Sequence, residues 1–211
     1  TTIGWPLIVN TFRSKILGSL PALHDEERVR ALQILTLDAD RYDDRTKAEK
    51  AVNLLLELRP WINAFLRKRH YPTQLTALRL LRVAIAHLQA SDEPSAEARE
   101  QMAHVLPTLC QTFTEHRKSN AREVFYSILI LLWETFPERD GEDALDTQRP
   151  AIRRALLHGM ADEAETIRVM VNKFWNESRR LSEEPFKRVP QTLTEVYHPD
   201  AEERWPGIAC S

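Results

Sequence analysis

Apolar residues recur along this chain at the three- and four-residue spacing of amphipathic helices, and this pattern limits the possible folds. Residues 73–88 show it plainly, with apolar side chains at Leu75, Leu78, Leu81, Ile85 and Leu88. Only five of the 211 residues are glycine, well under the roughly 7% that is usual. Because helix interiors tolerate glycine poorly and no strand-like alternation is long enough to compete, the sequence predicts an all-α fold.

Proline and polar clusters divide these helical segments. Breaks are expected at Tyr71-Pro72 and over 91–94, because proline disfavours helical backbone in the residue before it. We also expect Pro60 to separate a helix over 46–59 from a short helix over 61–69. Pro107 is expected to kink a helix over 95–114. The longest polar loop is expected over 138–148.

A weak internal period links the expected helices. Arg30, Arg79, Arg122 and Arg168 each stand inside an apolar helix, and they are 49, 43 and 46 residues apart. Helix-pair repeats of the HEAT and armadillo type have periods of roughly 40–47 residues. One such pair cannot bury its own apolar face, so the sequence predicts a HEAT/armadillo-type α-α superhelix, a solenoid of helix pairs. Arginines at this place are expected to bond a neighbouring loop or aspartate rather than a ligand.

We predict a single repeat segment over 1–211. Its approximate repeats are 5–40, 45–90, 95–136, 148–176 and a partial repeat over 182–211. The chain begins at Thr1 without a methionine and ends inside an apolar stretch at 208–211. These ends lead us to expect a piece of a longer chain.

The charge of the chain is nearly balanced, with 29 Lys and Arg against 31 Asp and Glu and a formal net charge of −2. No global field therefore draws it to DNA or a membrane, and a nucleic-acid contact would need a local patch. No apolar run is long enough to predict a membrane span. Cys110 and Cys210 lack metal or redox spacing, and neither His-Glu-x-x-His nor Cys-x-x-Cys occurs. We predict no metal, cofactor, small-molecule ligand or catalytic residue in this segment.

Basic clusters at helix ends are the candidates for a local patch. In a solenoid the turns of successive repeats line one edge, so basic turns could form a ridge that touches phosphates without reading base sequence. The alternative is that cations simply favour helix C-termini. The ridge would consist of Arg67, Lys68, Arg69, Arg117 and Lys118.

Aromatic residues are expected to pack between repeats. Trp61, Trp133 and Trp175 lie on apolar helical stripes, and Phe174 stands beside the last of them. A base-stacking role would instead require exposed rings in a positively charged groove.

Several segments resemble a known family. Residues 121–129 (Ala-Arg-Glu-Val-Phe-Tyr-Ser-Ile-Leu) are followed by an acidic loop and then by 156–163 (Leu-Leu-His-Gly-Met-Ala-Asp-Glu). Next come 172–175 (Asn-Lys-Phe-Trp), a polar turn over 177–181 and the 196–199 stretch (Val-Tyr-His-Pro). Their order resembles the HEAT-repeat region of the DNA-dependent protein kinase catalytic subunits, within the PI3-kinase-related kinases. Residues 24–28 resemble a more N-terminal part of that region.

The resemblance implies a non-catalytic scaffold segment, joined to the rest of a parent kinase chain, ahead of its FAT and kinase domains. The parent would be a nuclear serine/threonine kinase that acts with the Ku heterodimer at DNA ends, in double-strand-break repair by non-homologous end joining. ATP and magnesium would bind in its kinase domain, whose glycine-rich, His-Arg-Asp and Asp-Phe-Gly motifs do not occur here. This family prefers Ser or Thr before Gln, so Thr147, ahead of Gln148 and beside Arg149, is a candidate phosphosite.

Two other function classes stay open. A free-standing HEAT-repeat adaptor that binds proteins would have natural ends and polar capping helices. A helical-repeat DNA-repair enzyme would need a strongly basic concave face with a catalytic acid inside it, which the balanced charge disfavours.

Overall fold

The computed structural model describes residues 4–43, 45–90, 94–138, 143–177, 180, 182 and 184–196. Its regular structure there is helical, without a strand, which confirms the all-α prediction. The elements are α1 (Gly4–Ser19), α2 (Asp25–Ala39), α3 (Lys47–Arg67), α4 (Tyr71–Leu88), α5 (Ala96–Phe113), α6 (Ser119–Thr135), a 3-10 turn η1 (Asp146–Gln148), α7 (Arg149–Gly159), α8 (Glu165–Asn176) and α9 (Pro185–Val196).

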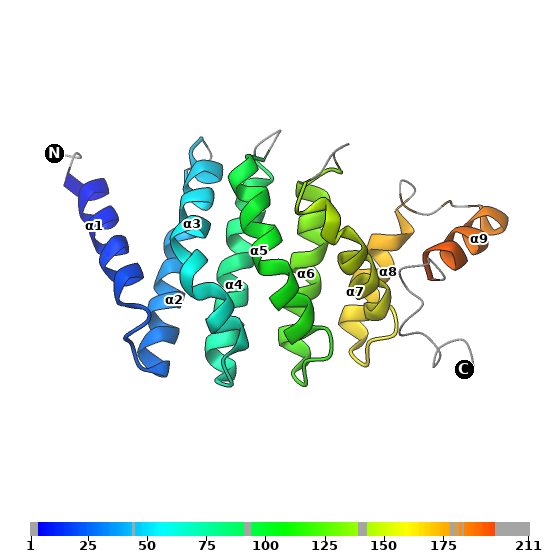
Figure 1. The fold of residues 1–211 in the computed structure, drawn as a ribbon, viewed down its shortest axis with the longest axis horizontal. Helices are drawn as coiled ribbons and strands as arrows, with labels where there is room; N and C mark the ends of the chain where they lie inside the picture. Colours follow the sequence, from blue (N-terminus) through cyan, green and yellow to red (C-terminus); the bar gives the residue numbers. More distant parts are fainter. Residues whose placement is uncertain are drawn as a thin grey trace.

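The helices from α1 to α8 stack in two layers. In one layer α2, α4, α6 and α8 pack each against the next, and in the other α3 packs on α5 and α5 on α7. The layers contact each other within the pairs α3–α4, α5–α6 and α7–α8. Figure 1 shows the pairs in a row, with the turns inside each pair along one edge, the lower edge in that view. The predicted all-α solenoid of helix pairs is confirmed. Its superhelical curvature, its HEAT or armadillo type and the repeat bounds stay predictions.

One apolar core runs through the stack from pair to pair. Leu32 of α2, Leu80 of α4, Ile128 of α6 and Ile167 of α8 are all fully buried. Each fully buried Leu or Ile side chain stabilises the fold by about 1.5–3 kcal/mol relative to exposure. Because much of this surface is covered by a neighbouring pair, the pairs depend on one another for stability.

Proline does not interrupt α3, so the predicted break at Pro60 is wrong. The helix continues from Lys47 to Arg67 with Pro60 inside it and exposed. Proline in a helix interior costs roughly 3 kcal/mol. Leu58 and Ile62, on either side of Pro60, are both buried in the same core. Tertiary packing therefore holds the two halves as one helix.

Pro107, inside α5, opens an acceptor that the next pair uses. Proline has no N–H, so the carbonyl of Ala103, four residues earlier, lacks its usual helical donor. The side-chain amide of Gln148, in η1, donates to this carbonyl over 2.8 Å. The proline thus creates a contact between α5 and the segment that leads into α7.

Trp61 is 38% exposed, contrary to the expectation that it packs between repeats. The buried stripe of α3 contains Leu54, Leu58 and Ile62. Trp61 stands at the margin of that stripe, next to the buried Ile62, and Leu56 on the same helix is also 38% exposed. The apolar period of the sequence therefore predicts a wider buried face than α3 has.

Gly159, at the end of α7, lies where α6 and α8 approach closely. A Cβ atom there would be 2.7 Å from Cε1 of Tyr126 and 3.0 Å from Cγ2 of Val171. Both neighbours are fully buried, so neither has room to move away.

We expect Gly159→Ala to lower the free energy of unfolding by about 1–3 kcal/mol, because the added methyl overpacks the core. Gly18→Ala is the matched control, since nothing lies within 4 Å of its Cβ position. That change should be neutral or stabilise by up to about 1 kcal/mol, because alanine favours helices. Urea denaturation of both variants measures the difference, and equal effects would contradict the packing at Gly159.

Candidate functional site

Each helix of the α2–α8 layer carries a long polar side chain near its start that holds the preceding turn. Arg28 Nε donates to the Leu20 carbonyl over 3.1 Å, and Gln74 Nε2 donates to the Leu66 carbonyl over 2.9 Å. In both cases the acceptor lies eight residues earlier in the chain. These side chains satisfy carbonyls that the ends of the preceding helices leave without a helical partner.

The later pairs use arginine in the same way. Nη1 of Arg122 donates to the His116 carbonyl over 2.6 Å. Nη1 of Arg168 donates to the Asp162 carbonyl over 2.7 Å. Both acceptors lie six residues earlier. The predicted role of Arg122 and Arg168 in bonding a loop or aspartate therefore holds. In the first two pairs the period runs through Arg28 and Gln74, and not through the predicted Arg30 and Arg79, which are exposed.

Arg122 also joins two successive helix pairs. Its Nε and Nη2 atoms bind the two carboxylate oxygens of Asp162, each over 2.8 Å, across 40 residues of sequence. Both side chains are buried. Burial alone would raise the pKa of Asp162, but the Arg122 guanidinium and the Ala164 N–H hold that pKa below its ordinary value. This two-bond ion pair fixes α6 against the turn between α7 and α8.

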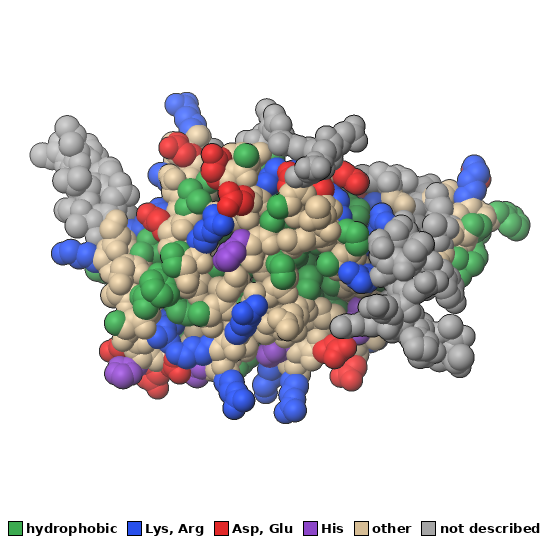
Figure 2. Space-filling view, in the orientation of Figure 1, with side chains coloured by type: hydrophobic (Ala, Val, Ile, Leu, Met, Phe, Trp, Pro, Cys, Tyr) green, Lys and Arg blue, Asp and Glu red, His purple; other side chains and the backbone are tan. Residues whose placement is uncertain are grey.

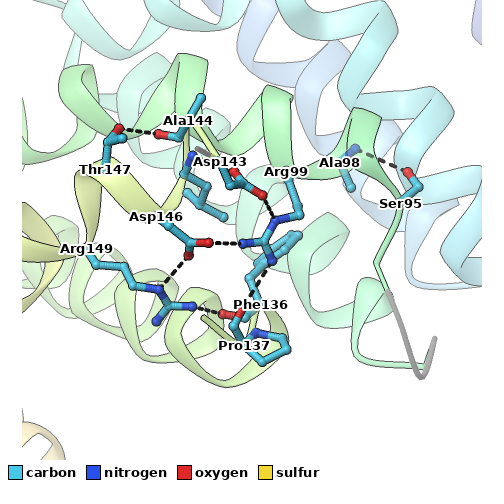
Figure 3. A network of polar contacts seen from close by, with 11 residues as sticks. Ser95, Ala98, Arg99, Phe136, Pro137, Asp143, Ala144, Asp146, Thr147 and Arg149 are labelled. Atoms are coloured by element: carbon cyan, nitrogen blue, oxygen red, sulfur yellow. Dashed lines mark hydrogen bonds and ion pairs between the residues drawn. The ribbon is translucent and has the colours of Figure 1, made fainter. Parts of the chain in front are cut away.

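Arg99, in the first turn of α5, is only 2% exposed although it is charged. It reaches the loop that precedes α7 (Figure 3). Its guanidinium binds the carboxylate of Asp143, the Asp146 Oδ2 atom over 2.9 Å and the Pro137 carbonyl over 3.1 Å. Arg149 then binds Asp146 Oδ1 over 2.7 Å, so a chain of alternating charges connects α5 to α7.

Thr147, the candidate phosphosite, belongs to this network (Figure 3). It is exposed, and its hydroxyl donates to the Ala144 carbonyl over 2.8 Å. The side chain of the following Gln148 binds Ala103, as described above. A phosphate on Thr147 would lie in η1, beside Asp146, and the nearby cations Arg99 and Arg149 already bind Asp143 and Asp146. Phosphorylation of Thr147 stays a prediction.

We expect Arg99→Met to lower the free energy of unfolding by about 3–5 kcal/mol, because it removes the buried cation that binds Asp143 and shares Asp146 with Arg149. Arg59→Met is the matched control. Arg59 pairs with Glu100, but the two side chains are 40% and 61% exposed, so its loss should cost at most about 1 kcal/mol. Chemical denaturation of both variants gives the comparison, and similar losses would show that Arg99 contributes no more than a surface ion pair.

The five residues of the predicted basic ridge all lie in or beside the turns of one edge, but two of them bind within the fold. Arg67 Nη2 donates to the hydroxyl of Thr108 over 3.1 Å, and Lys68 forms an ion pair with Asp25. Figure 2 shows Lys and Arg side chains projecting from the middle of the lower edge.

Arg69, Arg117 and Lys118 remain exposed, and their side chains form no hydrogen bond or ion pair with another described residue. We call these three residues the basic edge. Arg69 lies in the α3–α4 turn, and the other two lie in the α5–α6 turn.

Acidic side chains border the basic edge on both sides, a feature that the sequence reasoning missed. Glu26 and Glu27 are exposed at the start of α2, and Glu163 and Glu165 are exposed around the start of α8. The basic edge therefore extends over two neighbouring turns of the solenoid, the second of which also carries the exposed Glu115. The position of these residues at the turns of the first and last helix pairs, on either side of the basic turns, could have revealed it.

Side chains lock the two basic turns together. The Tyr71 hydroxyl donates to Asn120 Oδ1, and the ring of Tyr71 stacks on that of His116 with centroids 5.9 Å apart. Nε2 of His116 lies 3.3 Å from Oε1 of Gln74, and Nδ1 accepts a hydrogen bond from the Lys118 N–H over 3.2 Å. These contacts give the basic edge a defined geometry.

The pKa of His116 is held below its ordinary value. Burial is the main cause, and the positive charges of Arg122 and Lys118 act in the same direction. The Nδ1 atom must be unprotonated to accept the Lys118 N–H.

We therefore expect stability to fall as the pH is lowered. Because the unfolded chain takes up the His116 proton near pH 6.5 and the folded chain only at lower pH, stability is lost as the pH falls through and below about 6.5. Thermal unfolding at pH 7.5 and 5.5 should show a smaller pH-dependent loss in His116→Gln than in the unsubstituted chain. An identical pH dependence would exclude His116 as the cause.

Trp133, Phe174 and Trp175 form one aromatic cluster between α6 and α8. Phe174 and Trp175 are buried, and Trp133 is half-buried. The ring of Trp133 meets that of Phe174 edge-on, with centroids 6.0 Å apart, and the ring of Trp175 lies 6.5 Å away. The guanidinium of Arg149 lies 5.4 Å from the Trp133 ring centroid, which brings α7 into the same cluster.

Other candidate chemistry is limited within the part of the chain that the structure describes. It brings together no group of three or more His, Cys, Asp or Glu side chains in a metal-binding arrangement. None of its helices combines the length and apolar character that a membrane crossing requires. Burial raises the pKa of the Cys110 thiol to about 12, so the thiol is un-ionised at neutral pH. Cys210 and the 197–199 stretch lie outside the described residues.

Comparison with known proteins identifies relatives across nearly the whole chain. The family model described as "DNA-PKcs, CC5" matches residues 2–211. DNA-dependent protein kinase catalytic subunits from Dictyostelium discoideum, Xenopus laevis and Mus musculus are 26%, 23% and 22% identical to it, over 98%, 97% and 98% of this chain. The chain spans only 4% to 5% of the length of these relatives. No solved structure gives a significant match.

Proposed function

The chain belongs to the DNA-PKcs CC5 family, and from this membership we propose that it is a non-catalytic scaffold segment of a DNA-dependent serine/threonine protein kinase. The parent would act in the nucleus, in double-strand-break repair by non-homologous end joining. Its partners would be the Ku heterodimer and DNA ends, and the kinase domain would bind ATP and magnesium elsewhere in the parent. The relatives are named as catalytic subunits of this kinase, and the chain matches a small part of each.

One observation supports the scaffold role: the buried charges connect helix pairs. Arg99 reaches residues 38 to 47 positions away, and Arg122 reaches Asp162, 40 positions away. Such contacts set the position of one pair on the next. In a segment built in this way, a small rotation of one helix pair moves the next pair, so the rotations add up along the solenoid. A spacer between distant parts of a large enzyme requires this property.

Exposed polar contacts add to this connection. Along α3 and α5, Arg59 binds Glu100 over 2.8 Å, Asn63 binds the His104 carbonyl over 3.2 Å and Arg67 binds Thr108. Each contact spans 41 residues, so the two helices run parallel in fixed register. Exposed contacts of this kind contribute little to stability individually, but several in register oppose sliding.

The native polypeptide should be far larger than this chain. An immunoblot of source cells with an antibody against this segment should show a band on the order of twenty times its 24.5 kDa. The material precipitated by that antibody should phosphorylate a Ser-Gln peptide, and duplex DNA ends should stimulate the reaction.

A band near the mass of the chain itself would instead support the free-standing adaptor. A large band without DNA-stimulated kinase activity would argue against the kinase as parent. A precipitate made with the antibody blocked by the recombinant chain serves as the control for both readouts.

A further inference from the structure

The basic edge presents three cations that the fold does not use. Arg69, Arg117 and Lys118 are exposed without a carboxylate partner among the described residues, whereas the neighbouring Lys68 pairs with Asp25. Many other arginines of the solenoid bind within the fold, as Arg28, Arg99 and Arg122 do. Other exposed arginines, such as Arg41 and Arg79, are dispersed over the surface, whereas these three cations lie on two neighbouring turns, where an anionic partner would meet them together.

The two turns are held rigidly enough to act as one surface. Tyr71 follows Arg69 by two residues and bonds Asn120, which follows Lys118 by two. The stacking of Tyr71 on His116 and the approach of His116 to Gln74 join the same two turns. An anion that binds both turns therefore does not have to order them first, which reduces the entropic cost of binding.

The size of the basic edge limits what it can bind. Packed helices lie 8–10 Å apart, so two neighbouring turns present their cations over a distance of about 10 Å. An extended peptide rises about 3.3 Å per residue and covers this distance with roughly three or four residues. Three cations therefore match a short run of carboxylates, and each arginine can bind a carboxylate through two parallel hydrogen bonds.

Duplex DNA fits this surface less well. It carries one negative charge per roughly 1.7 Å of its length, far more than three cations neutralise. A duplex laid along the edge would also meet the exposed carboxylates of Glu26 and Glu27 on one side and of Glu163 and Glu165 on the other. These glutamates would repel a polyanion long enough to reach the flanking turns, but they would not meet a short one that covers only the two basic turns.

We propose that the basic edge, Arg69, Arg117 and Lys118, is a docking surface for a short acidic segment of a partner protein. The partner would place three or four Asp or Glu residues in an extended run across the two turns. The Glu residues of the flanking turns would set the length of the run that can bind. This inference goes beyond the scaffold role and does not depend on the identity of the parent chain.

Fluorescence anisotropy on the full chain tests the proposal. The probe is a labelled peptide with four consecutive glutamates between Gly-Ser ends, at an ionic strength of about 0.05 M, where screening is modest. The same peptide with glutamine in place of glutamate measures background. We expect the R69E/R117E/K118E variant to bind the acidic peptide at least about tenfold more weakly than the unsubstituted chain.

The matched control is R41E/R45E/R79E, which makes the same change in net charge. Arg41, Arg45 and Arg79 are also exposed and lie away from the two basic turns. The control should keep most of the peptide affinity. Circular dichroism should show both variants folded, since neither set of side chains forms a hydrogen bond or ion pair with a described residue.

Four outcomes would overturn the proposal. The first two are that the chain binds the acidic peptide no better than the glutamine peptide, or that it binds neither. The third is that the two triple variants weaken binding of the acidic peptide equally. The fourth is that a 12-base-pair duplex binds more tightly than the acidic peptide and that the R69E/R117E/K118E variant loses this binding. The last would identify nucleic acid as the occupant, one of the two alternatives that the sequence left open.

Discussion

The structure depends on the covering of each pair's apolar face by the next pair. Leu80 of α4 and Ile128 of α6 are fully buried, and their layer packs helix upon helix from α2 to α8. A single pair could not remove these side chains from water. The same dependence explains why α3 tolerates Pro60: its buried side chains on both sides of the proline gain more from the shared core than the proline costs locally.

Buried charges determine how the pairs sit on one another. Apolar contacts are not directional and allow small slides, whereas Arg122–Asp162 and the Arg99 network require particular partners at particular distances. A buried ion pair can contribute little net stability compared with an apolar pair of the same size. We therefore interpret these charges as setting the register of the stack, which is the property that a spacer in a large kinase would need.

The predicted basic ridge divides into a structural and an available part. Arg67 and Lys68 bind Thr108 and Asp25 and so help to join the pairs, whereas Arg69, Arg117 and Lys118 stay free on two adjacent turns. Contact of the ridge with phosphates stays a prediction. The acidic turns on either side confine the free part, which changes the kind of anion that fits it.

The sequence by itself determined the helices, their stacking as a solenoid and the family, because three- and four-residue periodicity and motif order are local properties of the chain. It also identified Arg122 and Arg168 as side chains that hold turns. Only the tertiary structure decided that Pro60 lies inside a helix, that Trp61 is exposed and that Gln148 binds Ala103. It also decided which of the five ridge cations are free. These outcomes depend on contacts between helices that are distant in sequence. Periodicity predicts which face of a helix is apolar, but it does not predict which other helix packs against that face.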